Sequence, residues 1–271
     1  MTHFFRDGEV FSALEQRLIP RLFDNKTPND AVRVWVPACA TGEEAYSLAM
    51  LLAEYRESRI DQPSVQIFAT DLDERAIATA REGFYKDTEI ADVSDARLDR
   101  YFHREPAGYR VRRELRELIL FAHHNIVKDP PFSHQDLISC RNFLIYLNRP
   151  AQDRVIDKFH FALRPGAFLL LGPSESLDGS AELFASVDRA LRLYQSRVVS
   201  GRMVVSELPG RVASAQTRSP EPRPLERLAP LDAHHRLLEE YAPPSLIVTE
   251  DHTIVHMSAH AGRFLQLTGG D

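Results

Sequence analysis

Short apolar runs alternate with helical patterns along the first 200 residues, and this alternation limits what the chain can fold into. The strand-like runs occupy residues 32–36, 65–69, 118–122, 137–139 and 167–171. Between them, apolar residues recur at helical spacing in residues 43–55, 73–81 and 150–163. Strands that alternate with helices are typical of a mostly parallel sheet that helices cover on both faces. The sequence therefore predicts an α/β fold.

Two segments depart from this alternation. Between residues 98 and 122, a turn signal at Pro106 and Gly108 precedes an alternating stretch at 109–112. This pattern predicts a small antiparallel hairpin inserted into the fold and attached to the main sheet. The last apolar runs, 167–171 and 190–196, are joined by a looser Ser/Asp/Gly stretch, so we expect an antiparallel edge there.

The composition changes after residue 200, where prolines mixed with Ser, Arg and Gln cannot build a core. We therefore predict a first domain at 1–200, a flexible linker at 201–232 and the start of a second domain at 233–271. Within this last part, apolar runs at 245–248 and 254–257 predict a strand pair.

Charge, cysteine content and hydropathy exclude several classes of protein. A net charge of −6 argues against a general nucleic-acid binder, which needs a basic excess for its phosphate contacts. Two distant cysteines, Cys39 and Cys140, are too few for a disulfide framework or a zinc site, so we expect reduced thiols and a cytoplasmic protein. No apolar run approaches the roughly 20 residues that span a bilayer, so membrane insertion is not expected.

The first strand-like run leads into a loop of small residues that opens a helix at Glu43 and Glu44. Small side chains let a ligand approach the backbone, and a helix start offers free amides. Acidic side chains at this position would repel a pyrophosphate but suit a ligand that carries an ammonium group. The pattern favours a cofactor with an amino-acid moiety over NAD, although glutamates also begin helices for purely structural reasons.

Acidic and amide residues follow the next two strand-like runs. An acid at the carboxyl end of the second strand can accept hydrogen bonds from both hydroxyls of a ribose, and we assign this function to Asp71. Asp73 is predicted to cap the following helix. Asn125, after the run at 118–122, either recognises the edge of an adenine or is only a turn residue.

Five segments in order give this sequence a strong resemblance to the CheR family of chemotaxis receptor methyltransferases. They are residues 2–7, 40–47, 69–73, 140–146 and 172–176, within a match from 2 to about 197. The resemblance implies a class I fold that binds S-adenosylmethionine (SAM), with a Rossmann-like, mostly parallel seven-stranded sheet. It also leads us to expect that the family's N-terminal helical domain is absent here.

The resemblance assigns cofactor-binding roles to Thr2, Arg6, Glu44, Asp71, Asn125, Ile126, Arg141 and Asn142. Glu44 corresponds to the residue that meets the amino group of the cofactor, and Asp71 to the ribose ligand. Asn125 and Ile126 correspond to the pair beside the adenine, whereas the last two residues close the pocket. No metal ligand is expected.

Arg6 and Tyr146 correspond to residues at the reacting centre. Methyl transfer to an ionised carboxylate requires no general base at pH 7, so orientation and exclusion of water are the main requirements. We expect Arg6 to hold the cofactor and the non-reacting oxygen, and Tyr146 to donate a hydrogen bond. The structural alternatives are that Tyr146 is a core aromatic and that Arg6 is a surface arginine.

The resemblance implies methyl esterification of glutamate side chains on the cytoplasmic helices of chemoreceptors or receptor-like signalling proteins. The arginines of 110–116 are either a solvated face or a docking patch for those acidic helices. Residues 239–248 resemble the entry to a PAS sensor domain, so methylesterase, PAS or kinase modules are possible partners. Two alternatives are a non-catalytic SAM-binding module of a PAS-containing sensor and a methyltransferase for a small acid.

Overall fold

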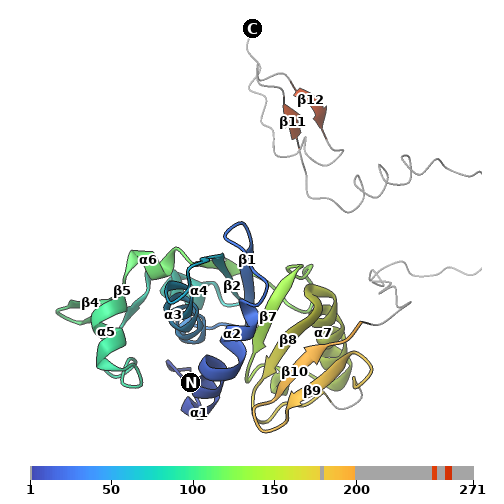
Figure 1. Cartoon of the computed structure of the whole chain (residues 1–271), viewed down its shortest axis with the longest axis horizontal. Coiled ribbons are helices and arrows are strands. Elements are labelled where there is room, and N and C mark those ends of the chain that lie inside the picture. The colour runs from blue at the N-terminus through green and yellow to red at the C-terminus, as the bar shows by residue number, and fades with distance from the viewer. Residues whose placement is uncertain (1, 178–179, 199–245, 249–253, 258–271) are drawn as a thin grey trace, which may run out of the picture. The chain divides into compact units, whose positions relative to one another are not determined.

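The computed structural model describes residues 2–177, 180–198, 246–248 and 254–257. The chain divides into two compact units, Met1–Ser206 and Glu207–Asp271, and each unit is described by itself. The first unit contains one large sheet, its covering helices and a small second sheet (Figure 1). The described part of the second unit is the antiparallel pair β11 (Leu246–Val248) and β12 (Ile254–Met257), which confirms the predicted strand pair.

The large sheet has seven strands in the order β6-β2-β1-β7-β8-β10-β9. Its strands are β1 (Ala31–Pro37), β2 (Ser64–Asp71), β6 (Ile119–His123), β7 (Gln135–Cys140), β8 (Leu163–Leu171), β9 (Phe184–Asp188) and β10 (Leu193–Ser196). The five strands from β6 to β8 are parallel, and β10 runs antiparallel to both of its neighbours. The predicted parallel sheet with an antiparallel edge is confirmed. Strand β9 lies inside the stretch that the sequence analysis takes for a loose connection.

The order of the strands reverses between β1 and β7. From β1 the chain builds outward through β2 to β6, and then crosses back to add β7 and β8 on the other side of β1. The loops after β1 and β7 therefore leave the sheet in opposite directions. In open α/β sheets such a reversal leaves a crevice at the carboxyl ends of the strands, where ligands bind.

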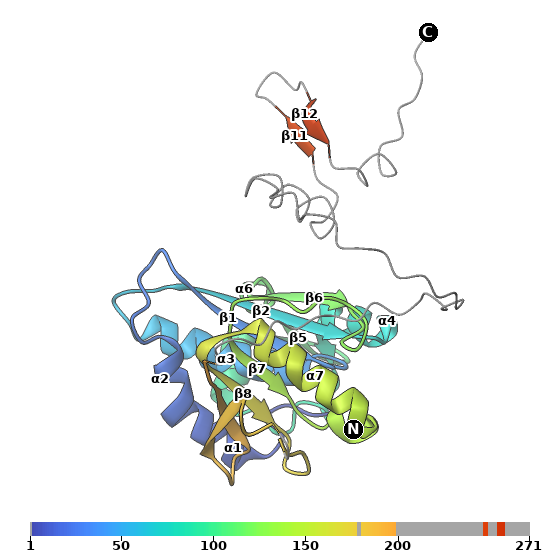
Figure 2. The same cartoon turned by 90° about the vertical axis from the view of Figure 1, so that its right-hand side faces the viewer.

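The described helical segments cover both faces of the large sheet. They are α1 (Gly8–Ala13), a π-helical turn (Leu14–Leu18), α2 (Ile19–Leu22), α3 (Glu43–Glu57), α4 (Glu74–Glu82), α5 (Asp95–Tyr101), α6 (Arg113–Arg116), a 3-10 turn (Leu144–Tyr146) and α7 (Arg149–Ala162). Helices α3 and α7 lie on opposite faces (Figure 2). The helical segment from α1 to α2 is not predicted by the sequence analysis.

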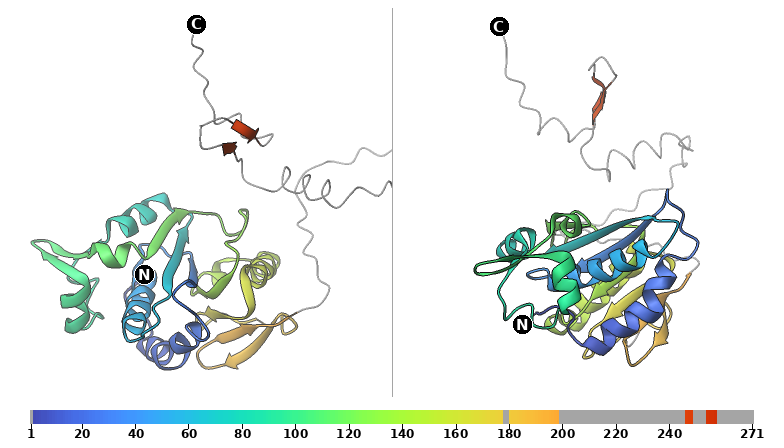
Figure 3. Two further views of the ribbon diagram at one scale, coloured as in Figure 1. Left: turned by 45° about the horizontal axis from the view of Figure 1, so that its top comes forward. Right: turned by 60° about the vertical axis from the view of Figure 1, so that its left-hand side comes forward.

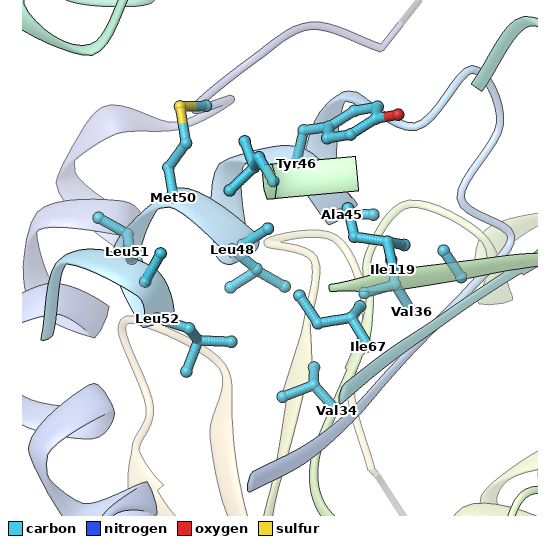
Figure 4. Close-up of a cluster of buried hydrophobic side chains, with 14 of the residues drawn as sticks. Val34, Val36, Ala45, Tyr46, Leu48, Met50, Leu51, Leu52, Ile67 and Ile119 are labelled. Atoms are coloured by element: carbon cyan, nitrogen blue, oxygen red, sulfur yellow. The ribbon is translucent and has the colours of Figure 1, made fainter. Parts of the chain in front are cut away.

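Successive residues of each central strand point to opposite faces, so the sheet has two cores. Val34 and Ile67 pack with Leu48 of α3 and its neighbours in the first core (Figure 4). Trp35 follows Val34 in β1 and therefore points to the other face of the sheet. Together with Ile138 of β7, it belongs to the second core, beneath α7. Burial on both faces explains why these strands appear in the sequence as continuous apolar runs.

The predicted hairpin is present, but its partner differs from the prediction. Strands β4 (Phe102–Glu105) and β5 (Gly108–Val111) form a separate three-stranded sheet with β3 (Phe84–Tyr85), in the order β3-β5-β4 (Figure 3). A Cβ atom at Gly108 would lie 2.2 Å from the carbonyl oxygen of Tyr85, so glycine permits this close approach. The insertion therefore pairs with the segment after α4 and not with the main sheet.

Within the described residues, no helix combines the length and the apolar character that crossing a membrane requires.

Substitution of a core residue on α3 tests the central position of this helix. Leu48→Ala should lower the free energy of unfolding by about 2–5 kcal/mol, because Leu48 is completely buried against the sheet. Urea denaturation followed by circular dichroism measures this change. The matched control is Ile60→Ala, since Ile60 is fully exposed and its loss should change stability by less than about 0.5 kcal/mol. Equal effects of the two substitutions would contradict the described core.

Candidate active site

A cavity of about 650 Å³ lies at the carboxyl ends of the central strands, where the strand order reverses. Its lining includes the loop after β1, the end of β2, the loop after β6, the segment after β7 and the N-terminal segment. The nine residues that the sequence analysis selects all line this cavity: Thr2, Arg6, Glu44, Asp71, Asn125, Ile126, Arg141, Asn142 and Tyr146. The fold thus brings together residues that lie up to 144 positions apart, from Thr2 to Tyr146 (146 − 2 = 144).

Several residues of the cavity wall have backbone conformations that residues other than glycine rarely adopt. Ala38 and Ala40 in the loop after β1 have φ angles of 54° and 48°, and Asn142 after β7 has a φ of 61°. Such residues each cost about 1–3 kcal/mol and persist where the surrounding structure holds them. All three residues line the cavity, so their strained backbone forms part of its wall.

Asp71 at the end of β2 is held in place by two backbone amides. Its Oδ2 accepts a hydrogen bond from the N–H of Ala40 at 2.8 Å, and its Oδ1 accepts one from the N–H of Asp73 at 2.9 Å. Since a carboxylate has about four acceptor sites, each oxygen can accept a further bond from a ligand hydroxyl. The side chain of Asp73 accepts from the N–H groups of Arg75 and Ala76, which confirms its predicted role as the cap of α4.

Of the two glutamates at the start of α3, only Glu44 lines the cavity. Its Oε1 accepts a hydrogen bond from the hydroxyl of Ser139 at 2.5 Å. Burial raises the pKa of Glu44, and the nearby guanidinium of Arg141 opposes this shift. Glu43 is buried elsewhere and accepts from the hydroxyl of Thr41 at 2.7 Å. The carboxylate of Glu44 is therefore the one that can meet an ammonium group in the cavity.

Arg141 connects three segments around Glu44. Its side chain is only 1% exposed, and its Nη1 lies 3.4 Å from Oε2 of Glu44. The same nitrogen donates to the carbonyl oxygen of Arg6 at 3.2 Å, and Nη2 forms an ion pair with Asp7. Arg141 thereby fixes the N-terminal segment against the end of β7. No local pattern in the sequence distinguishes Asp7, the ion-pair partner of Arg141, or Ser139, whose hydroxyl donates to Glu44.

A buried carboxylate holds the segment that closes the cavity. Glu175 accepts hydrogen bonds from the backbone N–H groups of Gly172, Asn142, Phe143 and Leu144 at 2.6–3.0 Å. A Cβ atom at Gly172 would lie 2.8 Å from the nitrogen of Asn142, so only glycine allows the two segments to approach. The resemblance marks 172–176 as a family segment, but it assigns no role to Glu175.

The loop after β6 presents Asn125 and Ile126 to the cavity. The side-chain oxygen of Asn125 accepts from the N–H groups of Val127 and Lys128 at 3.1 and 3.2 Å. These two bonds show that Asn125 is a turn residue, and its amide nitrogen is the group that it can offer to a ligand. The ammonium of Lys158 donates to three carbonyl oxygens of this loop at 2.8–3.1 Å and holds it from beneath.

Arg6 and Tyr146 line the same cavity. Arg6 is half-buried, and the segment around it is anchored because the N–H of Phe5 donates to the hydroxyl of Ser47 at 3.0 Å. Tyr146 ends the 3-10 turn, and its exposed fraction is 79%. The alternative in which Tyr146 is a core aromatic is therefore wrong.

The arginines of 110–116 have partners within the chain. Arg110 pairs with Glu105 and Arg113 with Glu117. The side chains of Arg112 and Arg116 donate to backbone carbonyl oxygens of Phe102, Asp99 and Glu82. The ion pairs offset the charges of Arg110 and Arg113, whereas hydrogen bonds to carbonyl oxygens leave the charges of Arg112 and Arg116 in place.

The lining fits an adenosyl amino acid. One carboxylate, that of Glu44 in the first turn of α3, can pair with the ammonium group of such a ligand. A second carboxylate, that of Asp71, has acceptor capacity for two hydroxyls, and Ile126 and Val127 offer apolar surface for a base. A largely apolar cavity with a few convergent polar groups is typical of cofactor sites.

Removal of charge at Glu175 tests the closing segment. Glu175→Gln should lower the free energy of unfolding by about 2–4 kcal/mol, because an amide cannot accept from four backbone N–H groups. The measurement is urea denaturation. The control is Glu117→Gln, which breaks an exposed ion pair and should cost at most about 1 kcal/mol. A loss at Glu175 no larger than that at Glu117 would show that the four bonds do not hold the segment.

Comparison with known proteins agrees with this geometry. The family model of the CheR methyltransferase SAM-binding domain matches residues 1–192. An uncharacterized 104.1 kDa protein of Rhodobacter capsulatus is 37% identical over all of this chain, which covers 28% of that protein. A chemotaxis protein methyltransferase of Borreliella burgdorferi is 32% identical over 67% of this chain and 66% of its own length.

A further relative is the chemotaxis protein methyltransferase Cher2 of Pseudomonas putida, which is 32% identical over 69% of this chain and 69% of its own length. The chain thus spans about two thirds of these chemotaxis methyltransferases and about a quarter of the longer relative. The family model covers most of the chain, and the site residues that the sequence predicts line one cavity. The chain therefore belongs to the CheR family of SAM-dependent methyltransferases.

Proposed function

We propose that this protein transfers the methyl group of SAM to glutamate side chains on the cytoplasmic helices of chemoreceptors or receptor-like signalling proteins. The product is a glutamyl methyl ester, and the reaction takes place in the cytoplasm. The observation that carries the proposal is the single cavity that joins the two ligand-accepting carboxylates, Glu44 and Asp71, to Arg6 and Tyr146. The printed names of several relatives, chemotaxis protein methyltransferases, support the pathway.

The deep part of the cavity holds the cofactor. Glu44 meets its ammonium group and Asp71 its ribose hydroxyls, while Asn125 and Ile126 lie beside the adenine. Thr2, Arg141 and Asn142 close the pocket around it. When bound, SAM supplies a methyl group that its sulfonium makes electrophilic. The backbone bonds to Asp71 keep its carboxylate oriented before the cofactor arrives, which lowers the cost of binding.

The open side of the cavity orients the glutamate of the substrate. With an ordinary pKa of about 4.3, this group is ionised at pH 7 and needs no general base. Arg6 holds the non-reacting oxygen, because a cation on the attacking oxygen would oppose a reaction that neutralises charge. The hydroxyl of Tyr146 donates a hydrogen bond, and its ring excludes water. Positioning of this type can supply about 7–11 kcal/mol of the barrier.

The second candidate is a non-catalytic SAM-binding module of a larger PAS-containing sensor, and it rests on the resemblance of residues 239–248 to the entry of a PAS domain. The similarity covers all of this chain and only 28% of the 104.1 kDa relative, so that protein has room for further modules. Methylesterase, PAS and kinase modules of the same pathway are the partners that we propose for either candidate.

Methyl transfer to receptor fragments tests the activity. The protein is incubated with methyl-labelled SAM and the cytoplasmic fragment of a chemoreceptor, and base-labile methanol is counted because glutamyl esters hydrolyse readily. Arg6→Ala and Tyr146→Phe should each lower kcat about tenfold or more. The control is Tyr194→Phe, a half-buried tyrosine of β10 that does not line the cavity. SAM binding without any labelled methanol would favour the non-catalytic module.

Isothermal titration calorimetry with SAM tests the role of Asp71 in cofactor binding. Asp71→Asn should weaken binding about tenfold or more, because the charged acceptor for the ribose is lost. Asp73→Asn provides a matched control two residues away, since asparagine caps a helix as well as aspartate does. Its SAM affinity should equal that of the unaltered protein. If both variants bind SAM normally and melt at the usual temperature, Asp71 is not the ribose ligand.

A further inference from the structure

The mouth of the cavity carries large apolar side chains that are exposed to solvent. Among the described residues, Leu72, Ile145 and Tyr146 line the cavity with exposed fractions of 59%, 47% and 79%. We call these three residues the apolar rim. They come from two different segments, the loop between β2 and α4 and the 3-10 turn after β7. Clustered exposed apolar groups at a site mark a surface that another molecule covers.

The segments that carry the apolar rim are held in fixed positions. The side-chain amide of Gln152 donates to the carbonyl oxygens of Leu144 and Leu147 at 2.9 and 3.1 Å, on either side of Ile145 and Tyr146. Leu72 lies between Asp71 and Asp73, whose carboxylates both accept backbone amides. The side chains of the apolar rim are thus held toward solvent by fixed turns. Because they are exposed, packing of the core does not require them to be apolar.

Charged groups beside the apolar rim select what it can contact. The half-buried Arg6 and the exposed Lys128 also line the cavity, so its lining carries two cations besides the buried Arg141. The carboxylates of the lining, Glu44 and Asp71, accept hydrogen bonds from residues of the chain. A partner that presents a carboxylate flanked by apolar side chains complements both features.

We propose that the apolar rim is a docking surface for apolar side chains that flank the methylated glutamate on its helix. On a helix, residues three and four positions away lie on the same face, about 5–6 Å from the glutamate. Such neighbours contact Leu72 and Ile145 while the carboxylate enters beside Arg6 and Tyr146. This inference rests on the proposed function. It adds a criterion for which glutamates are chosen, since a glutamate with polar neighbours leaves the rim exposed.

The test uses two helical peptides that differ only around one glutamate. One peptide has leucine at positions i−4 and i+3, and the other has serine at both. The unaltered protein should methylate the leucine peptide with a KM about tenfold lower, as expected for burial of apolar side chains. In the double variant Leu72→Ser with Ile145→Ser, the KM for the leucine peptide should rise about tenfold. The kcat at saturation should stay within about twofold, since the role proposed for both side chains is to bind the residues that flank the glutamate.

The matched control is Ile60→Ser with Phe161→Ser, two exposed apolar residues that do not line the cavity. It should retain the preference for the leucine peptide. Calorimetric titration of the rim variant with SAM should give an unchanged affinity, which also shows that the variant is folded. Equal KM values of the unaltered protein for the two peptides would overturn the docking surface. A lower SAM affinity of the rim variant would also overturn it, because the two residues would then belong to the cofactor site.

The peptides separate this inference from the function on which it rests. If the unaltered protein binds SAM but methylates neither the peptides nor a receptor fragment, the proposed function fails and the docking surface fails with it. If it methylates both peptides equally well, the proposed function stands and only the docking surface is lost.

Discussion

A buried guanidinium organises the site. The side chain of Arg141 is almost completely enclosed, and a charge in such a position is stable only when partners of opposite charge and hydrogen-bond acceptors surround it. Asp7, Glu44 and the carbonyl oxygen of Arg6 meet this requirement. The N-terminal segment, the start of α3 and the end of β7 are therefore tied to one point. This is why Arg6 lies at the cavity although the segment belongs to no strand of the sheet.

Carboxylates that accept backbone amides fix the rest of the site in the same way. Asp71 binds the loop after β1, and Glu175 binds the segment after β7. Both loops contain residues with positive φ angles, which need such support. These bonds hold both loops of the site, and the buried Arg141 balances the charge of Glu44 within it. The remaining acceptor capacity of Glu44 and Asp71 suits a cofactor that carries an ammonium group and hydroxyls.

The docking that we propose at the apolar rim would give the same cavity a second kind of recognition. In the proposed function, polar groups select the cofactor and the reacting carboxylate, whereas Leu72 and Ile145 contact the residues that flank that carboxylate. Hydrogen bonds distinguish chemical groups, and apolar contacts distinguish the sequences in which a common group such as glutamate occurs. The two segments that carry the rim are the same ones that carry Asp71 and Tyr146, so chemistry and selection share one framework.

The sequence by itself determined the five parallel strands, the helices α3, α4 and α7, and the residues at strand ends. Continuous apolar runs indicate burial on both faces, and Asp71 and Asp73 follow a strand at positions whose roles depend on local geometry. Only the tertiary structure decided that the hairpin pairs with β3 and not with the main sheet. It alone joined Ser139 to Glu44, 95 residues away, and Glu175 to the closing segment. The physical reason is that the spacing of apolar residues shows which side chains of a segment are buried. The partners of a side chain depend on which distant segments the sheet brings together.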